Sequence, residues 1–200
     1  MSPCHILLPV RPPEEGKTRL SGIFDADYRK TLNWRFFRNC LDIACQLVDA
    51  SRCIVVSRSL AVRDEAERRG AISLQEDGSD LNLALTQAAA FGRDRGASAV
   101  LSLSCDLPLL DKNDLDVMLQ VSREADVVIA PDRHRKGTNA LLVRPPLAIP
   151  YLYGASSLGA HLTAARKAGL SASVFYRRGL ATDIDLPNDT PLMPVEFLGY

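Results

Sequence analysis

Several short segments of the sequence are apolar at nearly every position, and this feature limits the fold most strongly. "CIVVS" (53–57), "AVLSLS" (99–104) and "ADVVIA" (125–130) lack the apolar–polar alternation of a half-exposed strand. Such runs are typical of strands buried on both faces, as in a parallel sheet with helices on its two sides. Longer segments with helical periodicity separate them. The alternation therefore predicts an α/β fold with a doubly wound, mostly parallel sheet.

The same patterns place the individual elements. Strands are expected at Cys4–Val10, Arg52–Ser57, Ala71–Gln75, Ala99–Ser104, Ala125–Ala130, Thr138–Arg144 and Ala172–Tyr176. Helices are expected at Tyr28–Ala50, Ala61–Arg69, Asp80–Arg95, Lys112–Arg123 and Ser157–Ala168. A chain of 200 residues without an internal repeat is expected to form one domain, residues 1–200. Ligands of such sheets bind beyond the carboxyl ends of the strands, where the polar, motif-like segments of this sequence lie.

Composition excludes some classes of protein. The 24 Lys and Arg residues balance 24 Asp and Glu residues, whereas nucleic-acid and membrane-surface binders carry a basic excess. No apolar run approaches the roughly 18–20 residues of a membrane span, and no signal peptide is visible. The five cysteines form no C-x-x-C pair, so reduced thiols and a cytoplasmic location are expected. We expect small-molecule partners, no nucleic acid and no membrane, with a homodimer left open as an assembly.

The segment "PVRPPEEGKTRL" (9–20) follows the first predicted strand and ends like a phosphate-binding P-loop. A P-loop needs glycine where this chain has Arg11, and Pro12 and Pro13 remove two of the N–H groups that such a loop supplies. The ATPase interpretation therefore fails. Arg11, Lys17 and Arg19 still give the loop three cations, and these predict a site for a polyphosphate.

Three aspartates are candidates for binding Mg²⁺, which takes one or two carboxylates together with water and phosphate oxygens. Asp106 follows the apolar strand "VLSLS"; a helix cap or a turn is its alternative role. Asp183 and Asp185 flank Ile184 in an extended segment, so both carboxylates share a face while Ile184 turns to the core. A solvated acidic edge is the alternative for this pair.

Two further segments are candidates for binding an anion. In "KGTNALLV" (136–143), Gly137 permits close backbone approach and Thr138 can donate a hydrogen bond; a hairpin turn is the alternative. In "GASSLGAH" (154–161), a helix begins near Ser156 and Ser157, and its free N–H groups attract anions; simple serine capping is the alternative. His161 lies one turn further and could face the same anion or only the helix surface.

A basic loop, three aspartates and two anion sites together suit the transfer of a nucleotide to an anionic acceptor. The protein would mainly position the reactants and neutralise charge. A phosphate monoester has a second pKa of about 6 and is already ionised at neutral pH, so no general base is needed. The sequence has only three histidines and none in a metal-binding spacing, which is consistent with this chemistry.

The motifs "LLPVRPPEEGKTRL", "CDLPLL", "PDRHRKGTNALLV", "GASSLGAH" and "DIDLPND" occur in this order. With them the chain resembles the 2-phospho-L-lactate guanylyltransferase family of coenzyme F-420 (deazaflavin) biosynthesis, over about positions 4–190. The resemblance implies a nucleotidyltransferase fold like that of enzymes that make nucleotide-sugars. It also implies transfer of GMP from GTP to 2-phospholactate, phosphoenolpyruvate or 3-phosphoglycerate, with release of pyrophosphate.

The resemblance also implies roles for individual residues. The Mg²⁺ carboxylates are expected to be Asp106, Asp183 and Asp185. The phospho-acid is expected to bind at Thr138, Gly154 and Ser157. The nucleotide is expected to contact Arg11, Lys17, Arg19, Gly78 and Asn82. Arg11 and Lys17 would also act catalytically by stabilising the departing pyrophosphate.

The chain departs from the family pattern at three points. The resemblance leads us to expect lysine at the position of Arg11 and a small residue such as glycine or alanine at that of Cys105. Glu14 and Glu15 add two acids to the loop that is expected to face phosphate. We expect the two glutamates to point to solvent. Two other functions stay open on sequence grounds: a molybdopterin cytidylyltransferase-like enzyme of the same fold, and a non-catalytic nucleotide-binding module.

Overall fold

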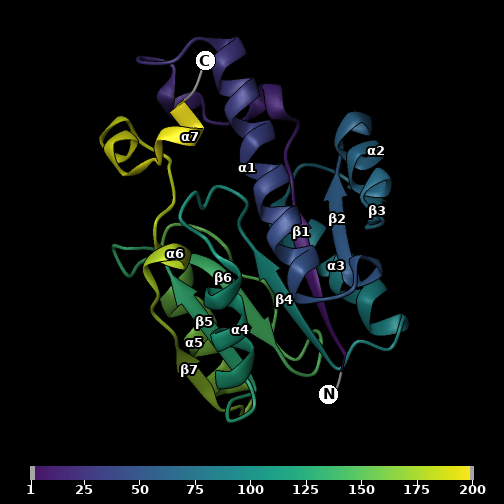
Figure 1. Cartoon of the computed structure of the whole chain (residues 1–200). Helices are drawn as coiled ribbons and strands as arrows, with labels where there is room; N and C mark the ends of the chain where they lie inside the picture. The colour runs from purple at the N-terminus through teal and green to yellow at the C-terminus, as the bar shows by residue number, and fades with distance from the viewer. Residues whose placement is uncertain (1–2, 199–200) are drawn as a thin grey trace.

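The computed structural model describes residues 3–198, and a seven-stranded sheet in the order β3-β2-β1-β4-β6-β5-β7 forms its centre (Figure 1). The strands are β1 Cys4–Pro9, β2 Cys53–Ser57, β3 Ile72–Gln75, β4 Ala99–Leu103, β5 Val127–Pro131, β6 Thr138–Val143 and β7 Ala172–Val174. The α-helices are α1 Ala26–Leu47, α2 Leu60–Arg68, α3 Leu81–Asp94, α4 Lys112–Val121, α5 Ser157–Lys167, α6 Arg178–Ala181 and α7 Val195–Leu198. Short 3-10 helices occupy η1 Pro13–Glu15, η2 Thr18–Leu20, η3 Ala50–Arg52 and η4 Pro187–Leu192.

The sheet is mostly parallel, as the apolar runs predict. Strand β1 lies between β2 and β4 and is parallel to both, β3 is parallel to β2, and β7 is parallel to β5. Strand β6 is the exception, because it runs antiparallel to β4 and to β5. All the expected strands and the five expected helices are present, with ends that differ by a few residues. The short helices α6 and α7 have no counterpart in the prediction.

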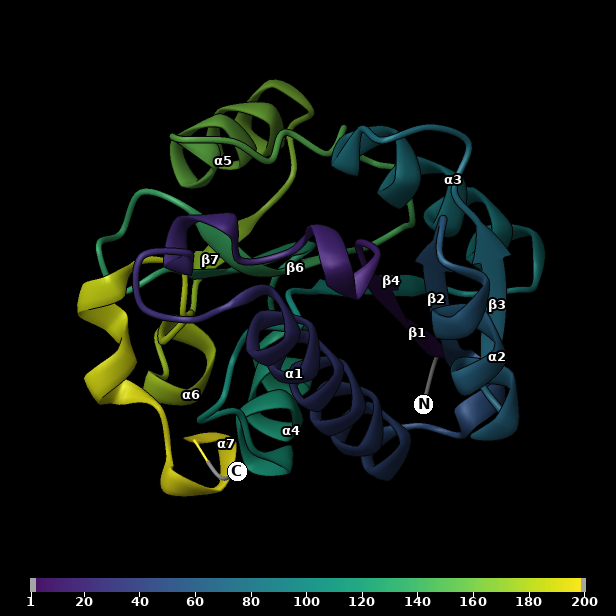
Figure 2. The ribbon, with the colours of Figure 1, turned by 90° about the horizontal axis from the view of Figure 1, so that it is seen from above.

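Each central strand is buried on both faces, which explains its continuous apolar sequence. In β1, Ile6 and Leu8 belong to the core under α1, α2 and α4, whereas Leu7 belongs to the core under α3 and α5. Seen from above, α3 and α5 lie on one side of the sheet, and α1, α2 and α4 lie on the other (Figure 2). A third cluster, which includes Phe36 and Ile184, joins α1 to the C-terminal segment.

The segment between β5 and β6 is a tight hairpin turn. Asp132 organises it: its carboxylate accepts from the Lys136 N–H at 2.8 Å, and its carbonyl accepts from the Arg135 N–H at 3.0 Å. Arg135 takes a left-handed conformation with φ of 54°. The hairpin alternative for "KGTN" is therefore what the backbone forms, and Thr138 begins the strand that follows.

Within residues 3–198, none of the helices combines the length and the apolarity that a membrane span requires.

Candidate active site

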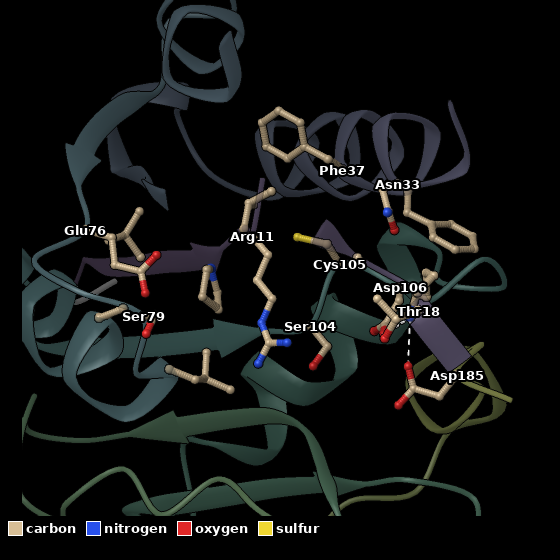
Figure 3. A pocket seen from close by; sticks show the side chains of 18 of the residues that line it. Arg11, Thr18, Asn33, Phe37, Glu76, Ser79, Ser104, Cys105, Asp106 and Asp185 are labelled. Atoms are coloured by element: carbon tan, nitrogen blue, oxygen red, sulfur yellow. Dashed lines mark hydrogen bonds and ion pairs between the residues drawn. The ribbon is translucent and has the colours of Figure 1, made fainter. Parts of the chain in front are cut away.

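A cavity of about 500 Å³ opens at the carboxyl ends of β1 and β4 (Figure 3). Segments that are distant in sequence line it: the loop after β1, helix α1, the segment after β3 and the segment after β4. Its lining includes Arg11, Lys17 and Arg19 from the basic loop and Asp106 and Asp185 from the acidic motifs. The fold therefore gathers five of the predicted site residues at the edge of the sheet where ligands of this architecture bind.

Lys17 joins the two acidic motifs. Its Nζ lies 2.5 Å from Asp106 Oδ2 and 2.8 Å from Asp185 Oδ1. The lysine side chain is 8% exposed, whereas the carboxylates of Asp106 and Asp185 are 26% and 46% exposed, so the acids stay open to the cavity. Burial alone would lower the pKa of Lys17, but the two carboxylates outweigh it and raise that pKa. Lys17 is thus a fixed cation beneath an acidic surface.

The loop that carries Lys17 is held by its backbone and by helix α1. Lys17 adopts a left-handed conformation (φ 56°, ψ 34°), which is uncommon for a residue other than glycine. The Asn33 amide of α1 donates to the carbonyl of Pro13 at 2.7 Å. A Cβ at Gly16 would overlap the same Asn33 amide, so glycine is required for this close approach.

The two glutamates of the loop are exposed to solvent, as expected, and neither lines the cavity. Glu14 is exposed, and exposed Glu15 pairs with Arg58, with 2.6 Å between Oε2 and Nη2. Cys105 lines the cavity, and Cys40 Sγ on α1 donates to the carbonyl of the preceding residue, Ser104, at 3.7 Å. Lys17 and Asp106 are in contact although Cys105 and the two glutamates lie in the same segments.

The third predicted metal ligand, Asp183, lies beside this pair in a separate set of contacts. Its carboxylate accepts from the Asn139 amide at 3.4 Å and lies 3.7 Å from Arg133 Nη1. Burial raises the pKa of Asp183, and the negative charges of Asp106 and Asp185 raise it further. Ile184 between the two acids is fully buried, as the extended pattern predicts. Asp183 therefore adds negative charge next to the Lys17 pair.

The donor set fits a magnesium ion. No group of three or more Asp, Glu, His or Cys side chains in residues 3–198 is arranged to hold a metal ion by itself. Mg²⁺ does not need such a group, because it takes one or two carboxylates and completes its shell with waters and phosphate oxygens. Asp106 and Asp185 would supply the two carboxylates, and Asp183 would add a third acidic group close to Lys17.

Thr138 is buried at the start of β6 and forms a hydrogen bond with His161 of α5, at 3.1 Å between Oγ1 and Nδ1. The other ring nitrogen, Nε2, accepts from the Leu152 N–H at 2.9 Å. Neutral imidazole carries one proton, so that proton lies on Nδ1 and is donated to Thr138. The Thr138 hydroxyl hydrogen then remains free to donate to a ligand. Burial lowers the pKa of His161 to about 4, which keeps the ring neutral.

The N-terminus of α5 packs against the β5–β6 turn. The Leu158 N–H donates to the carbonyl of Lys136 at 3.1 Å, and the Ser157 N–H donates to Gly154 at 3.2 Å. Ser156 is the N-cap residue but forms no side-chain cap, so the simple capping alternative does not describe it. The structure brings Gly154 and Ser157 to the same turn that leads into Thr138, and their binding role stays a prediction.

The two residues expected near guanosine do not line the main cavity, although their sequence neighbours Ser79 and Leu81 do. Gly78 lines an adjacent hollow of about 240 Å³ together with Glu76 and Ala84. Asn82 uses its amide on the backbone of Tyr153: Oδ1 accepts from the N–H at 2.7 Å, and Nδ2 donates to the carbonyl at 3.3 Å. Asn82 thus ties α3 to the segment before α5, and its contact with a nucleotide stays a prediction.

A family model described as "Guanylyl transferase CofC like" matches residues 4–194. The chain belongs to this family. Three relatives illustrate the substrates named within the CofC-like family. A phosphoenolpyruvate guanylyltransferase of Rubrobacter xylanophilus is 38% identical, with 92% of this chain and 89% of that protein covered. A 3-phospho-D-glycerate guanylyltransferase of Colwellia psychrerythraea is 31% identical (94% and 90% covered). A 2-phospho-L-lactate guanylyltransferase of Methanothermobacter thermautotrophicus is 34% identical (94% and 82% covered).

Solved structures agree on the fold of this CofC-like chain. A crystal structure from Desulfovibrio desulfuricans, provisionally described as a nucleotide-diphospho-sugar transferase, matches with a TM-score of 0.71 at 20% identity. The match covers 93% of this chain and 84% of that one. The resemblance and the nucleotidyltransferase-like fold inferred from the motifs are both confirmed.

Several site residues of this CofC-like chain escaped the sequence analysis. Asn139 and Arg133 hold Asp183, and both lie in "PDRHRKGTN", where Gly137 and Thr138 were singled out instead. Asn33 was assigned only to a helix, and nothing in its surroundings marks it as the anchor of the basic loop. Glu76 lies in a polar stretch with several other acids, and only the cavity distinguishes it.

Proposed function

We propose that this chain transfers GMP from GTP to the phosphate group of a three-carbon phospho-acid and releases pyrophosphate, as a step of coenzyme F-420 biosynthesis. Phosphoenolpyruvate, 3-phosphoglycerate and 2-phospholactate are the candidate acceptors. The observation that carries the proposal is the cavity in which Lys17 joins Asp106 and Asp185, in a chain of the CofC-like family. In such a site, Lys17 would neutralise part of the negative charge of a polyphosphate, and the partly exposed carboxylates of Asp106 and Asp185 lie beside it.

The basic loop would hold the triphosphate. Arg11 and Arg19 are exposed at the cavity, and Lys17 lies below them. These fixed cations can stabilise the charge that develops on pyrophosphate as the bond to the α-phosphorus breaks. Arginine can also grip phosphate oxygens with two parallel N–H groups, so Arg11 is suited to bind the triphosphate.

The acceptor would lie by Thr138 and the N-terminus of α5. The Thr138 hydroxyl, which accepts from His161, has its own hydrogen available for an acceptor oxygen. The acceptor phosphate is ionised at neutral pH and attacks without a base, so His161 need not exchange a proton during the reaction. The chain's contribution is to align the attacking phosphate with the α-phosphorus of GTP.

We further propose Mg²⁺ as the metal, bound by Asp106 and Asp185 with Asp183 nearby. Bound Mg²⁺ would neutralise the phosphate oxygens of the nucleotide and acceptor. Lys17 contacts both carboxylates and holds them at one point of the cavity. The cytoplasmic location expected from the sequence belongs to the same proposal.

A matrix of nucleotides and acceptors tests the function. Purified protein is incubated with Mg²⁺, one of GTP, ATP, CTP or UTP, and one of the three phospho-acids, and pyrophosphate release is measured. We expect release with GTP and at least one phospho-acid, and loss of release when EDTA replaces Mg²⁺. Activity with CTP and none with GTP would contradict the proposal and favour the cytidylyltransferase alternative.

A further inference from the structure

The cavity has two chemically different ends. Asp106 and Asp185 lie at one end, Glu76 and Ser79 lie at the other, and the Arg11 side chain extends between them (Figure 3). A triphosphate is attracted to the cations of the basic loop and repelled by an isolated carboxylate. The end at Glu76 is therefore suited to the other part of a nucleotide, its base.

The position of Glu76 is fixed by the sheet. It directly follows β3, and its backbone N–H donates to the carbonyl of Ser57 at the end of β2, at 3.3 Å. Its side chain is only 11% exposed. The carboxylate is therefore presented at the sheet edge by two paired strands.

The contact between the Glu76 carboxylate and Arg58 is long. Arg58 Nε lies 3.5 Å from Glu76 Oε2, beyond the usual length of a hydrogen bond, while its terminal nitrogens bind Glu15 at 2.6 and 3.3 Å. Burial raises the pKa of Glu76, and the opposing effects of Arg58 and Arg11 do not cancel the increase. A ligand that supplies N–H donors would compensate the lost hydration of this group.

The walls near Glu76 suit a flat ring. Val56, Leu81 and Ala84 line the cavity there and offer apolar contact to the faces of a base. The edge of the base would then meet the carboxylate. Guanine has two neighbouring donors, N1–H and the 2-amino group, that match the two oxygens of a carboxylate. Adenine and cytosine present a ring-nitrogen lone pair at the corresponding place, which a carboxylate repels.

We propose that Glu76 is the specificity-determining residue for guanine, accepting hydrogen bonds from N1–H and the 2-amino group of GTP. The assignment rests on the proposed function, because it names the group that selects the nucleotide in that reaction. It also explains why a cavity built for a polyphosphate contains a carboxylate far from the Lys17 pair.

Inosine triphosphate tests the assignment, because it differs from GTP only by the missing 2-amino group. A hydrogen bond to a charged acceptor contributes about 1.5–3 kcal/mol, which corresponds to roughly 10- to 150-fold. We expect wild-type protein to favour GTP over ITP by at least about tenfold in kcat/KM. In Glu76→Gln this preference should fall towards 1, mainly through a higher KM for GTP.

Glu15→Gln is the matched control. It removes the other carboxylate that binds Arg58 but leaves the carboxylate in the cavity. The preference for GTP should persist in this variant. A Glu76→Gln protein that keeps the wild-type GTP/ITP ratio, or a wild-type protein that uses both nucleotides equally, would overturn the assignment.

Binding measurements separate this inference from the proposed reaction. Calorimetry with GTP and with ITP on the wild-type protein needs neither turnover nor a folded variant. Tighter binding of GTP than of ITP without pyrophosphate release would support the assignment of Glu76 and contradict the transfer reaction. Equal binding of the two nucleotides alongside normal release would support the transfer reaction and refute the role of Glu76.

Discussion

His161 gives the sharpest test of how the structure is held together. Its ring is fully buried, accepts from the Leu152 N–H and donates to Thr138. The contact with Leu152 needs the neutral ring, because protonation of Nε2 would place an N–H opposite the Leu152 N–H. Stability should therefore fall as the pH falls into the range where an unfolded chain binds a proton at this residue.

The size of the effect follows from the shift in pKa. Burial lowers the pKa of His161 from 6.5 to about 4, so the unfolded chain binds more protons than the folded chain between these values. The stabilisation is fully present above about pH 6.5 and is lost as the pH falls towards 4. Each pH unit in this window costs about 1.4 kcal/mol, so the loss between pH 7 and pH 5 is about 2 kcal/mol.

The assay compares wild-type protein with His161→Asn by urea unfolding at pH 7 and pH 5. The wild type should be more stable at pH 7, and the difference between the proteins should shrink by about 2 kcal/mol at pH 5. Contributions from other titrating groups are shared by both proteins and cancel in the difference. His134→Asn, at an exposed position of the β5–β6 turn, is the matched control for replacing a histidine outside the core. A pH-independent difference for His161→Asn would refute the conclusion that this ring is held neutral.

Three further predictions concern the basic loop and its acidic partners. Asp106→Asn or Asp185→Asn should lower pyrophosphate release at least about 100-fold, because each substitution removes a negative charge without changing the shape of the side chain. The thermal melting curve should stay cooperative. Normal turnover in both variants would contradict the metal assignment. Lys17→Met leaves the two carboxylates without their shared cation. It should lower kcat by about 100-fold, measured at saturating GTP, and a variant with wild-type kcat would exclude Lys17 from catalysis. Gly16→Ala places a methyl group against Asn33 and should cost about 1–3 kcal/mol in urea unfolding, whereas an unchanged midpoint would show that the Asn33 amide moves aside.

The strands were predictable from sequence because a strand that is buried on both faces is apolar at nearly every position. Every residue of β2, β4 and β5 is buried, so each of these strands is a run without polar alternation. The sequence contains no comparable signal for the direction of β6. An apolar strand has the same composition whether it runs parallel or antiparallel, and the tight turn at Asp132 decides the direction in this chain.

Five of the residues that line the candidate cavity were singled out from the sequence, but their arrangement was not predictable. Asp106 stands out because it is a polar residue shortly after an apolar strand. Asp185 stands out because it and Asp183 flank the buried Ile184. That both carboxylates converge on Lys17 depends on its left-handed backbone and on the anchoring of its loop by Asn33. Neither feature is visible in a linear pattern.

The sequence alone determined the class of fold, the edge of the sheet where the candidate cavity opens and the family to which the chain belongs. These follow from local patterns: apolar runs, strand ends and short motifs in a fixed order. Only the tertiary structure decided which polar groups are buried and what each one faces. His161 at Thr138 and Glu76 at the far end of the cavity owe their chemistry to packing between elements distant in the chain. Burial and electrostatic environment arise from that packing, so no local sequence pattern could specify them.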